Sequence, residues 1–200
     1  MANSALDALG FILGTLLNLY ALVVALRFVM QAVRADYYNP IAQFVVKATD
    51  PLLVPLRRVV PSAGGYDTAS LVLAWGVLLV KLLAFATLGL GAVRAAGLEL
   101  VVAGAGVGTL VGLSLVDLVN LLFNIVIFSL VAQALLSWLP NANASPAWGL
   151  LQGITRPVLA PLRRVVPPFG GLDLSALLAI IGLFALQSFV VGVLYQLVAG

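Results

Sequence analysis

Residues 51–67, PLLVPLRRVVPSAGGYD, return 106 residues later as residues 157–173, PVLAPLRRVVPPFGGLD. Twelve of the seventeen aligned positions are identical. The same shift of 106 residues aligns other positions without a gap, including Asn18 with Asn124. Chance similarity between apolar segments would not keep the prolines, the arginine pair, the glycine pair and the aspartate in register. The chain is therefore a tandem duplication, and its two halves are copies of one structural unit.

The composition is that of a membrane protein. Hydrophobic residues make up 63% of the chain and charged residues 8%, and the mean hydropathy is +1.18. Soluble proteins are about half apolar and about a quarter charged. Four segments with at most one charge each are long enough to cross a bilayer, which needs about 20 helical residues. We predict transmembrane helices at about 8–30, 68–90, 114–138 and 174–198.

Each half is predicted to hold a transmembrane helix, a charged connector and a second transmembrane helix. The first repeat covers residues 1–93 and the second residues 114–200, and a glycine-rich linker at 94–113 joins them. We predict an all-α membrane protein, with four transmembrane helices in two parallel tandem repeats and a short interfacial helix or elbow within each repeat. Two crossings per repeat keep the repeats parallel. Residues 98–113 form either an external loop or a re-entrant segment, and both readings stay open.

The distribution of basic residues predicts the orientation. The linker carries one basic residue, Arg94, whereas seven lie in the two connectors. Because basic residues concentrate in cytoplasmic loops, we expect both connectors in the cytoplasm and both termini in the periplasm of a bacterial inner membrane. The seven connector residues are Arg34, Lys47, Arg57, Arg58, Arg156, Arg163 and Arg164.

The repeated motif predicts an elbow at the membrane surface. Asp50 or Thr155 suits the N-cap of a short helix, and Pro51 or Pro157 suits its first position. The arginines that follow are expected to reach the phosphate level, where they contact anionic lipid headgroups, another anion or a partner protein. A glycine turn and an aspartate cap then lead into the next crossing. These arginines are Arg57, Arg58, Arg163 and Arg164, and the turn and cap residues are Gly64, Gly65, Asp67, Gly170, Gly171 and Asp173.

Lys81 lies inside the second predicted transmembrane helix. A charged lysine near the bilayer centre costs about 2.5–3.5 kcal/mol, so a compensating partner is expected. Asp117 is the main candidate counter-charge. Two roles are open for Lys81: a pair or snorkelling contact that fixes helix packing, or a part in ion or proton movement. The repeat-related Asn18 and Asn124 are candidates for hydrogen bonds between helices.

Several functional classes are disfavoured by the composition. The chain has no cysteine and no histidine, which excludes thiol chemistry, imidazole bases and the usual zinc and haem ligands. Its seven acidic residues are scattered, so we predict no metal site. The basic residues do not form the continuous face that nucleic-acid binding needs. We therefore expect a protein that is not an enzyme, has no cofactor and binds no nucleic acid.

Residues 27–71, RFVMQAVRADYYNPIAQFVVKATDPLLVPLRRVVPSAGGYDTASL, and the second copy through residues 161–178, PLRRVVPPFGGLDLSALL, resemble the YggT family of bacterial inner-membrane proteins. The resemblance covers almost the whole chain, since such proteins contain two YggT domains. It implies a multipass membrane protein, linked in some bacteria to tolerance of osmotic shock and to potassium supply. Chloroplast and cyanobacterial relatives are tied to cytochrome b6 haem maturation, cell division or nucleoid distribution.

No catalytic residues are established for the family, so the resemblance carries none over. Two functions are expected from it. The protein conducts or modulates ion flux, in keeping with osmotic tolerance and ion homeostasis, or it is a scaffold or assembly factor for other membrane complexes. A membrane-protein partner or a homo-oligomer is expected in the second case.

Overall fold

The computed structural model describes residues 2–139, 141–165 and 174–199. Within them, four helices are long and apolar enough to cross a membrane, which is the number predicted. Two further helices lie in the connectors, and a β-hairpin lies in the linker. The elements are α1 (Ala2–Ala32), α2 (Pro40–Leu56), α3 (Thr68–Leu88), β1 (Ala92–Ala95), β2 (Leu98–Val101), α4 (Val107–Leu136), η1 (Ala142–Ala144), α5 (Pro146–Val165) and α6 (Leu174–Ala199).

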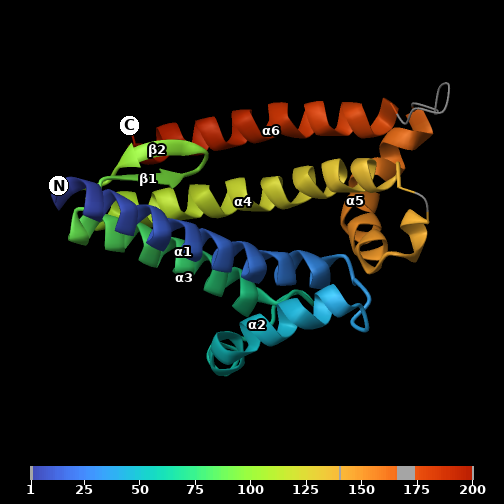
Figure 1. Ribbon diagram of the computed structural model, residues 1–200, viewed down its shortest axis with the longest axis horizontal. Coiled ribbons are helices and arrows are strands. Elements are labelled where there is room, and N and C mark those ends of the chain that lie inside the picture. Colours follow the sequence, from blue (N-terminus) through green and yellow to red (C-terminus); the bar gives the residue numbers. More distant parts are fainter. Residues whose placement is uncertain (1, 140, 166–173, 200) are drawn as a thin grey trace.

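The two repeats have the same order of helices. The starts of α2 and α5, at residues 40 and 146, and of α3 and α6, at 68 and 174, are each 106 residues apart. Figure 1 shows α1 and α4 running in one direction and α3 and α6 returning. We call the end where α1 and α4 begin the hairpin end, because β1 and β2 and both termini lie there. The opposite end, where α1 and α4 finish, is the connector end. The repeats are therefore parallel, as predicted.

The connector helices are longer than the predicted elbows. Asn39 caps α2, because its side chain accepts the Ile41 N–H at 2.9 Å, and Pro40 occupies the start of the helix. The prediction that Asp50 or Thr155 caps a short helix was therefore wrong. Both residues lie well inside α2 and α5.

The motif prolines are inside these helices and do not begin them. Each pair is four residues apart, so its members share one helix face, and that face is exposed. The carbonyl groups that lose an N–H partner to proline then point outward, which lets the helix continue. The opposite face of α2, which includes Thr49, is buried. The prolines are Pro51 and Pro55 in α2 and Pro157 and Pro161 in α5.

The linker differs most from the prediction, because α4 begins at Val107 and not near residue 114. Before it, Ala92 pairs with Val101 and Ala95 with Leu98 in an antiparallel hairpin. The two loop residues, Ala96 and Gly97, have φ of +52° and +81°. Positive φ at both central positions is the geometry of the tight hairpin turns that match strand twist.

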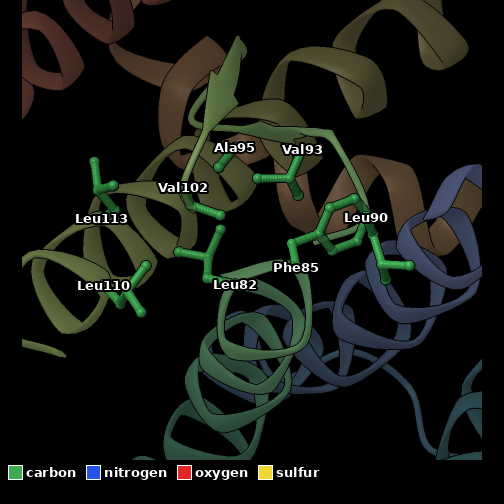
Figure 2. Packing of buried hydrophobic residues seen from close by; sticks show 8 residues of the cluster. All are labelled: Leu82, Phe85, Leu90, Val93, Ala95, Val102, Leu110 and Leu113. Atoms are coloured by element: carbon green, nitrogen blue, oxygen red, sulfur yellow. The ribbon is translucent and has the colours of Figure 1, made fainter. Parts of the chain in front are cut away.

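The hairpin is packed among the helices near their ends. Figure 2 shows its apolar residues facing side chains of α3 and α4. At the tip, Ala96 is buried against Val116 of α4 and Val191 of α6. Val116 is nine residues beyond the start of α4, about 14 Å at 1.5 Å per residue. One face of the hairpin therefore packs into the end of the bundle, whereas most residues of β2 are exposed. The cluster comprises Leu82, Phe85, Leu90, Val93, Ala95, Val102, Leu110 and Leu113.

Candidate functional site

Lys81 is fully buried, and its ammonium group has three partners. Nζ donates to Asp117 Oδ2 at 2.6 Å, to Asn18 Oδ1 at 2.8 Å and to the Arg94 carbonyl at 3.0 Å. An ammonium group has three N–H donors, so the site satisfies it completely. The predicted pairing of Lys81 with Asp117 is confirmed. Lys81 lies seven residues before Leu88, about 10 Å from the hairpin end of α3, and three residues from the midpoint of this helix.

The other oxygen of the Asp117 carboxylate holds the hairpin. Oδ1 accepts the Ala96 N–H at 2.8 Å. Asp117 therefore joins α4, α3 and the hairpin loop, while the Arg94 carbonyl joins Lys81 to β1. The charges of Lys81 and Asp117 cancel. A buried pair of this kind fixes one arrangement of its elements, because breaking it would leave an uncompensated charge.

The second repeat has an uncharged version of this site. Gln187, the counterpart of Lys81, donates to Asn120 Oδ1 at 2.7 Å and to Asn124 Oδ1 at 2.8 Å. Asn18 and Asn124 thus have equivalent roles, and both are acceptors in the bonds that join helices. The repeats keep the polar contact and differ in its charge.

Arg27 forms a second buried polar contact, which sequence reasoning missed. Its Nη1 donates to Thr49 Oγ1 at 2.6 Å, to Asp50 Oδ1 at 2.8 Å and to the Val46 carbonyl at 3.1 Å. The contact fixes α2 against α1. Its counterpart in the second repeat is uncharged, since the Thr155 hydroxyl donates to Gln133 Oε1. Arg27 was overlooked because a charge that borders an apolar window looks like the end of the span.

The motif arginine Arg57 has a partner within the protein. It forms an ion pair with Asp67, and its side chain remains 42% exposed. Asp67 occupies the N-cap position of α3, but its carboxylate makes no capping bond, because Arg57 takes it. The Asp67 N–H donates to Gln31 Oε1 at 2.7 Å. Arg58 is exposed.

The hydrogen bond that the Arg57 guanidinium donates to the Asp67 carboxylate raises the pKa of Arg57 above its ordinary value. A group whose folded pKa is raised contributes its full stability below the unfolded pKa and loses it only as the pH rises through the folded value. Arg57 therefore keeps its charge and its pair across the physiological range.

The predicted glycine turn is present in the first repeat. Gly64 and Gly65 have φ of +61° and +80°, a backbone conformation that glycine adopts without strain. In the second repeat, Arg163 and Arg164 lie in the last turn of α5. The turn predicted at Gly170 and Gly171 and the cap predicted at Asp173 fall outside the described residues.

Comparison with protein families matches both halves of the chain. The family model described as CCB3/YggT matches residues 6–88 and again residues 112–194. The two matches are offset by 106 residues, the spacing of the sequence repeat. The chain belongs to the CCB3/YggT family. Together with the four candidate spans, this makes it a multipass membrane protein with two tandem YggT units.

Relatives in this family match most of the chain. An uncharacterized protein of Pseudomonas aeruginosa is 40% identical over 90% of this chain and 87% of its own length. One of Vibrio alginolyticus is 36% identical over 89% of this chain and 90% of its own length. The uncharacterized protein YggT of Escherichia coli K12 is 33% identical over 94% of this chain and 92% of its own length. No solved structure matches the chain.

Two cavities in this YggT-family chain are lined by polar residues. The first, about 700 Å³, lies between α1 and α4 beneath the hairpin, and we call it the groove. Asn18 and Asn124 both line it. The second, about 750 Å³, lies at the connector end beside α5, and we call it the basic cavity. Arg163 lines the basic cavity, whereas Lys81 lines neither. Thus neither of these cavities is lined by both Lys81 and a motif arginine.

Proposed function

We propose that this YggT-family chain is a non-catalytic scaffold or assembly factor for other complexes of the bacterial inner membrane. The observation that carries the proposal is that Lys81 is fully buried and bonded only to protein groups. A lysine that moves ions or protons needs contact with water, but Lys81 has no exposed surface and its three donors all bind protein acceptors. Its chemistry serves to hold α3, α4 and the hairpin together.

The groove is the place we assign to a transmembrane helix of a partner protein. In a symmetric pair of repeats, the packing of α3 on α4 would be repeated by packing of α6 on α1. Within the described residues, α3 packs on α4, but no comparable packing joins α6 to α1. The groove beside α1 has apolar walls, including Phe11, Leu22 and Phe128, and amide groups at Asn18 and Asn124. Amide side chains of this kind hydrogen-bond across helices in membranes.

Site-specific photo-crosslinking in intact membranes tests this assignment. A photoreactive amino acid is placed in the groove at Thr15 or at Leu22, and for comparison at Phe189, an exposed residue of α6 outside the groove. Both groove positions should give one and the same protein adduct, which Phe189 does not give. Adducts with lipid alone from Thr15 and Leu22 would overturn the scaffold proposal.

Ion flux is the second candidate. It is favoured by the basic cavity and by the link of related proteins to osmotic tolerance and potassium supply. Potassium or proton flux in liposomes separates the two functions. The scaffold proposal expects no flux above that of empty liposomes. Flux that is lost in Lys81→Met but kept in Gln187→Leu, when both variants elute as folded protein in size-exclusion chromatography, would replace it with conduction.

A further inference from the structure

The Arg27 contact has a changed counterpart in the second repeat. In the first repeat, the Arg27 guanidinium fills the space beside Thr49 and binds the Asp50 carboxylate. In the second, the position of Arg27 holds Gln133, a shorter and neutral side chain, and the position of Asp50 holds Arg156. The second repeat therefore lacks the buried cation of the first, and it has a basic residue where the first repeat has an acidic one.

An open space lies where this exchange occurs. Gln133, Thr155 and Arg156 all line the basic cavity. Thr155 is fully buried and Gln133 is 8% exposed, so they form its floor, whereas Arg156 is exposed near its opening. The place that a guanidinium fills in the first repeat is thus part of a cavity of about 750 Å³ in the second.

The charge of the basic cavity is positive. Among the described residues that line it, the charged ones are three arginines and one aspartate, a net charge of 3 − 1 = +2 for that part of the lining. The aspartate, Asp36, already accepts the Tyr38 N–H at 2.9 Å with one oxygen. Because guanidinium groups bind phosphate through paired N–H donors, three of them around one space favour a phosphate-bearing anion. The three are Arg34, Arg156 and Arg163.

Arg34 reaches this cavity from a strained backbone. Its φ is +53°, in the left-handed region that costs a non-glycine residue about 1–2 kcal/mol. The conformation ends α1, where the Ala35 N–H bonds to the Met30 carbonyl at 2.8 Å. Glycine would fit such a helix end without strain. Backbone strain of this kind clusters at functional sites, so an arginine in this conformation is a candidate for a binding role.

We infer that the basic cavity binds a phosphate group, with Arg34, Arg156 and Arg163 around it and Gln133 and Thr155 at its floor. Apolar residues such as Leu159 also line the cavity, and α5 is an amphipathic helix outside the four spans. The phosphate of an anionic phospholipid and inorganic phosphate share the required chemistry. The lipid adds acyl chains that suit the apolar wall.

Repeat-guided substitutions test the site in the full-length protein. Native mass spectrometry in a neutral detergent measures the occupancy of added phosphatidylglycerol, with phosphatidylcholine as the zwitterionic reference. A parallel titration follows the melting temperature against inorganic phosphate. Arg156→Gln should weaken phosphatidylglycerol binding about tenfold. The double variant Gln133→Arg with Arg156→Asp installs the arrangement of the first repeat, so it should fill the cavity and abolish binding without loss of folding.

Arg58→Gln is the matched control, since it removes the same charge from an exposed motif arginine outside the cavity. It should leave binding within twofold of the original protein. Tight phosphatidylglycerol binding without a phosphate effect identifies the lipid, and saturable stabilisation by inorganic phosphate alone identifies the free anion. Equal weakening by Arg58→Gln and Arg156→Gln, or unchanged binding in the double variant, overturns the site. The scaffold proposal does not depend on either result, since it is tested at the groove.

Discussion

The Lys81 ammonium and the Asp117 carboxylate, 2.6 Å apart, join the first repeat to the second. Lys81 belongs to α3 and Asp117 to α4, and the repeat counterpart of Asp117 is Phe11. The pair is therefore a feature of one repeat interface and not of the repeated unit. It also holds the hairpin through Ala96 and Arg94.

Replacement of Lys81 alone should destabilise the fold. Lys81→Met leaves the Asp117 carboxylate buried without its counter-charge, a loss of about 3–5 kcal/mol for buried pairs. Removal of both charges in Lys81→Met with Asp117→Leu should recover part of this stability, because no buried charge is left unpaired, although the Ala96 N–H and the Arg94 carbonyl lose their partners. Thermal unfolding in detergent, followed by size-exclusion chromatography, measures both variants. A double variant less stable than Lys81→Met would contradict this account of the pair.

Substitution of Gln187, the repeat counterpart of Lys81, measures how much an uncharged contact contributes to stability. Gln187→Leu removes the amide bonds to Asn120 and Asn124 and should cost about 1.2 kcal/mol, since hydrogen bonds between membrane helices average about 0.6 kcal/mol each. The same unfolding assay compares it with Lys81→Met. A loss of stability as large as that of Lys81→Met would show that the charge of Lys81 does not make its contact stronger than the neutral contact of Gln187.

Arg27 should hold α2 against α1. Arg27→Gln copies the residue of the second repeat, removes the bond to Asp50 and should cost about 1.5–3 kcal/mol, the range for hydrogen bonds to charged groups. Limited proteolysis of α2 measures its release from α1. Arg58→Gln, which removes an equal charge from an exposed site, should leave the cleavage rate unchanged. Equal rates in the two variants would mean that Arg27 does not anchor α2.

A close approach of α1 to the start of the hairpin depends on glycine. A Cβ at Gly10 would lie 2.8 Å from the Leu90 carbonyl oxygen, so the backbone must move in Gly10→Ala. We expect a loss of about 1–3 kcal/mol, as in other overpacked sites. Gly76→Ala is the control, since nothing lies within 4 Å of its added methyl group. It should match or exceed the original melting temperature in detergent, because alanine favours helix.

Cysteine labelling tests the predicted orientation. The chain has no cysteine, so single variants need no altered background. Arg58→Cys and Arg164→Cys should react with an impermeant maleimide only after the inner membrane is opened. Glu99→Cys, on the exposed edge of the hairpin, should react in intact spheroplasts. Reaction of positions 58 and 164 from opposite sides would contradict the shared cytoplasmic location of the connectors.

The sequence predicted the spans and the central pair because both follow from strong constraints. A bilayer requires long uncharged segments, and a lone lysine inside one requires a counter-charge. The connector helices were misplaced because Pro51 normally ends or begins a helix, and its outward orientation depends on which face of α2 is buried. The hairpin was missed because its strands have four residues each, too few for an alternating pattern to stand out among apolar residues.

The basic cavity could not be predicted from either repeat alone. Gln133 is an unremarkable polar residue until Arg27 is seen to fill the equivalent space. The change of Asp50 to Arg156 was visible in the aligned repeats, but its meaning depends on the contact that Asp50 makes.

Within the described residues the hairpin occurs once, whereas the six α-helices form three pairs related by the repeat. The hairpin covers one end of the groove with Ala92, Val93, Arg94 and Glu99. In that part of the chain the groove therefore has no equivalent under a second hairpin. A partner helix in the groove would bind with a stoichiometry of one per chain, so a complex with two such partners would contain two copies of the chain.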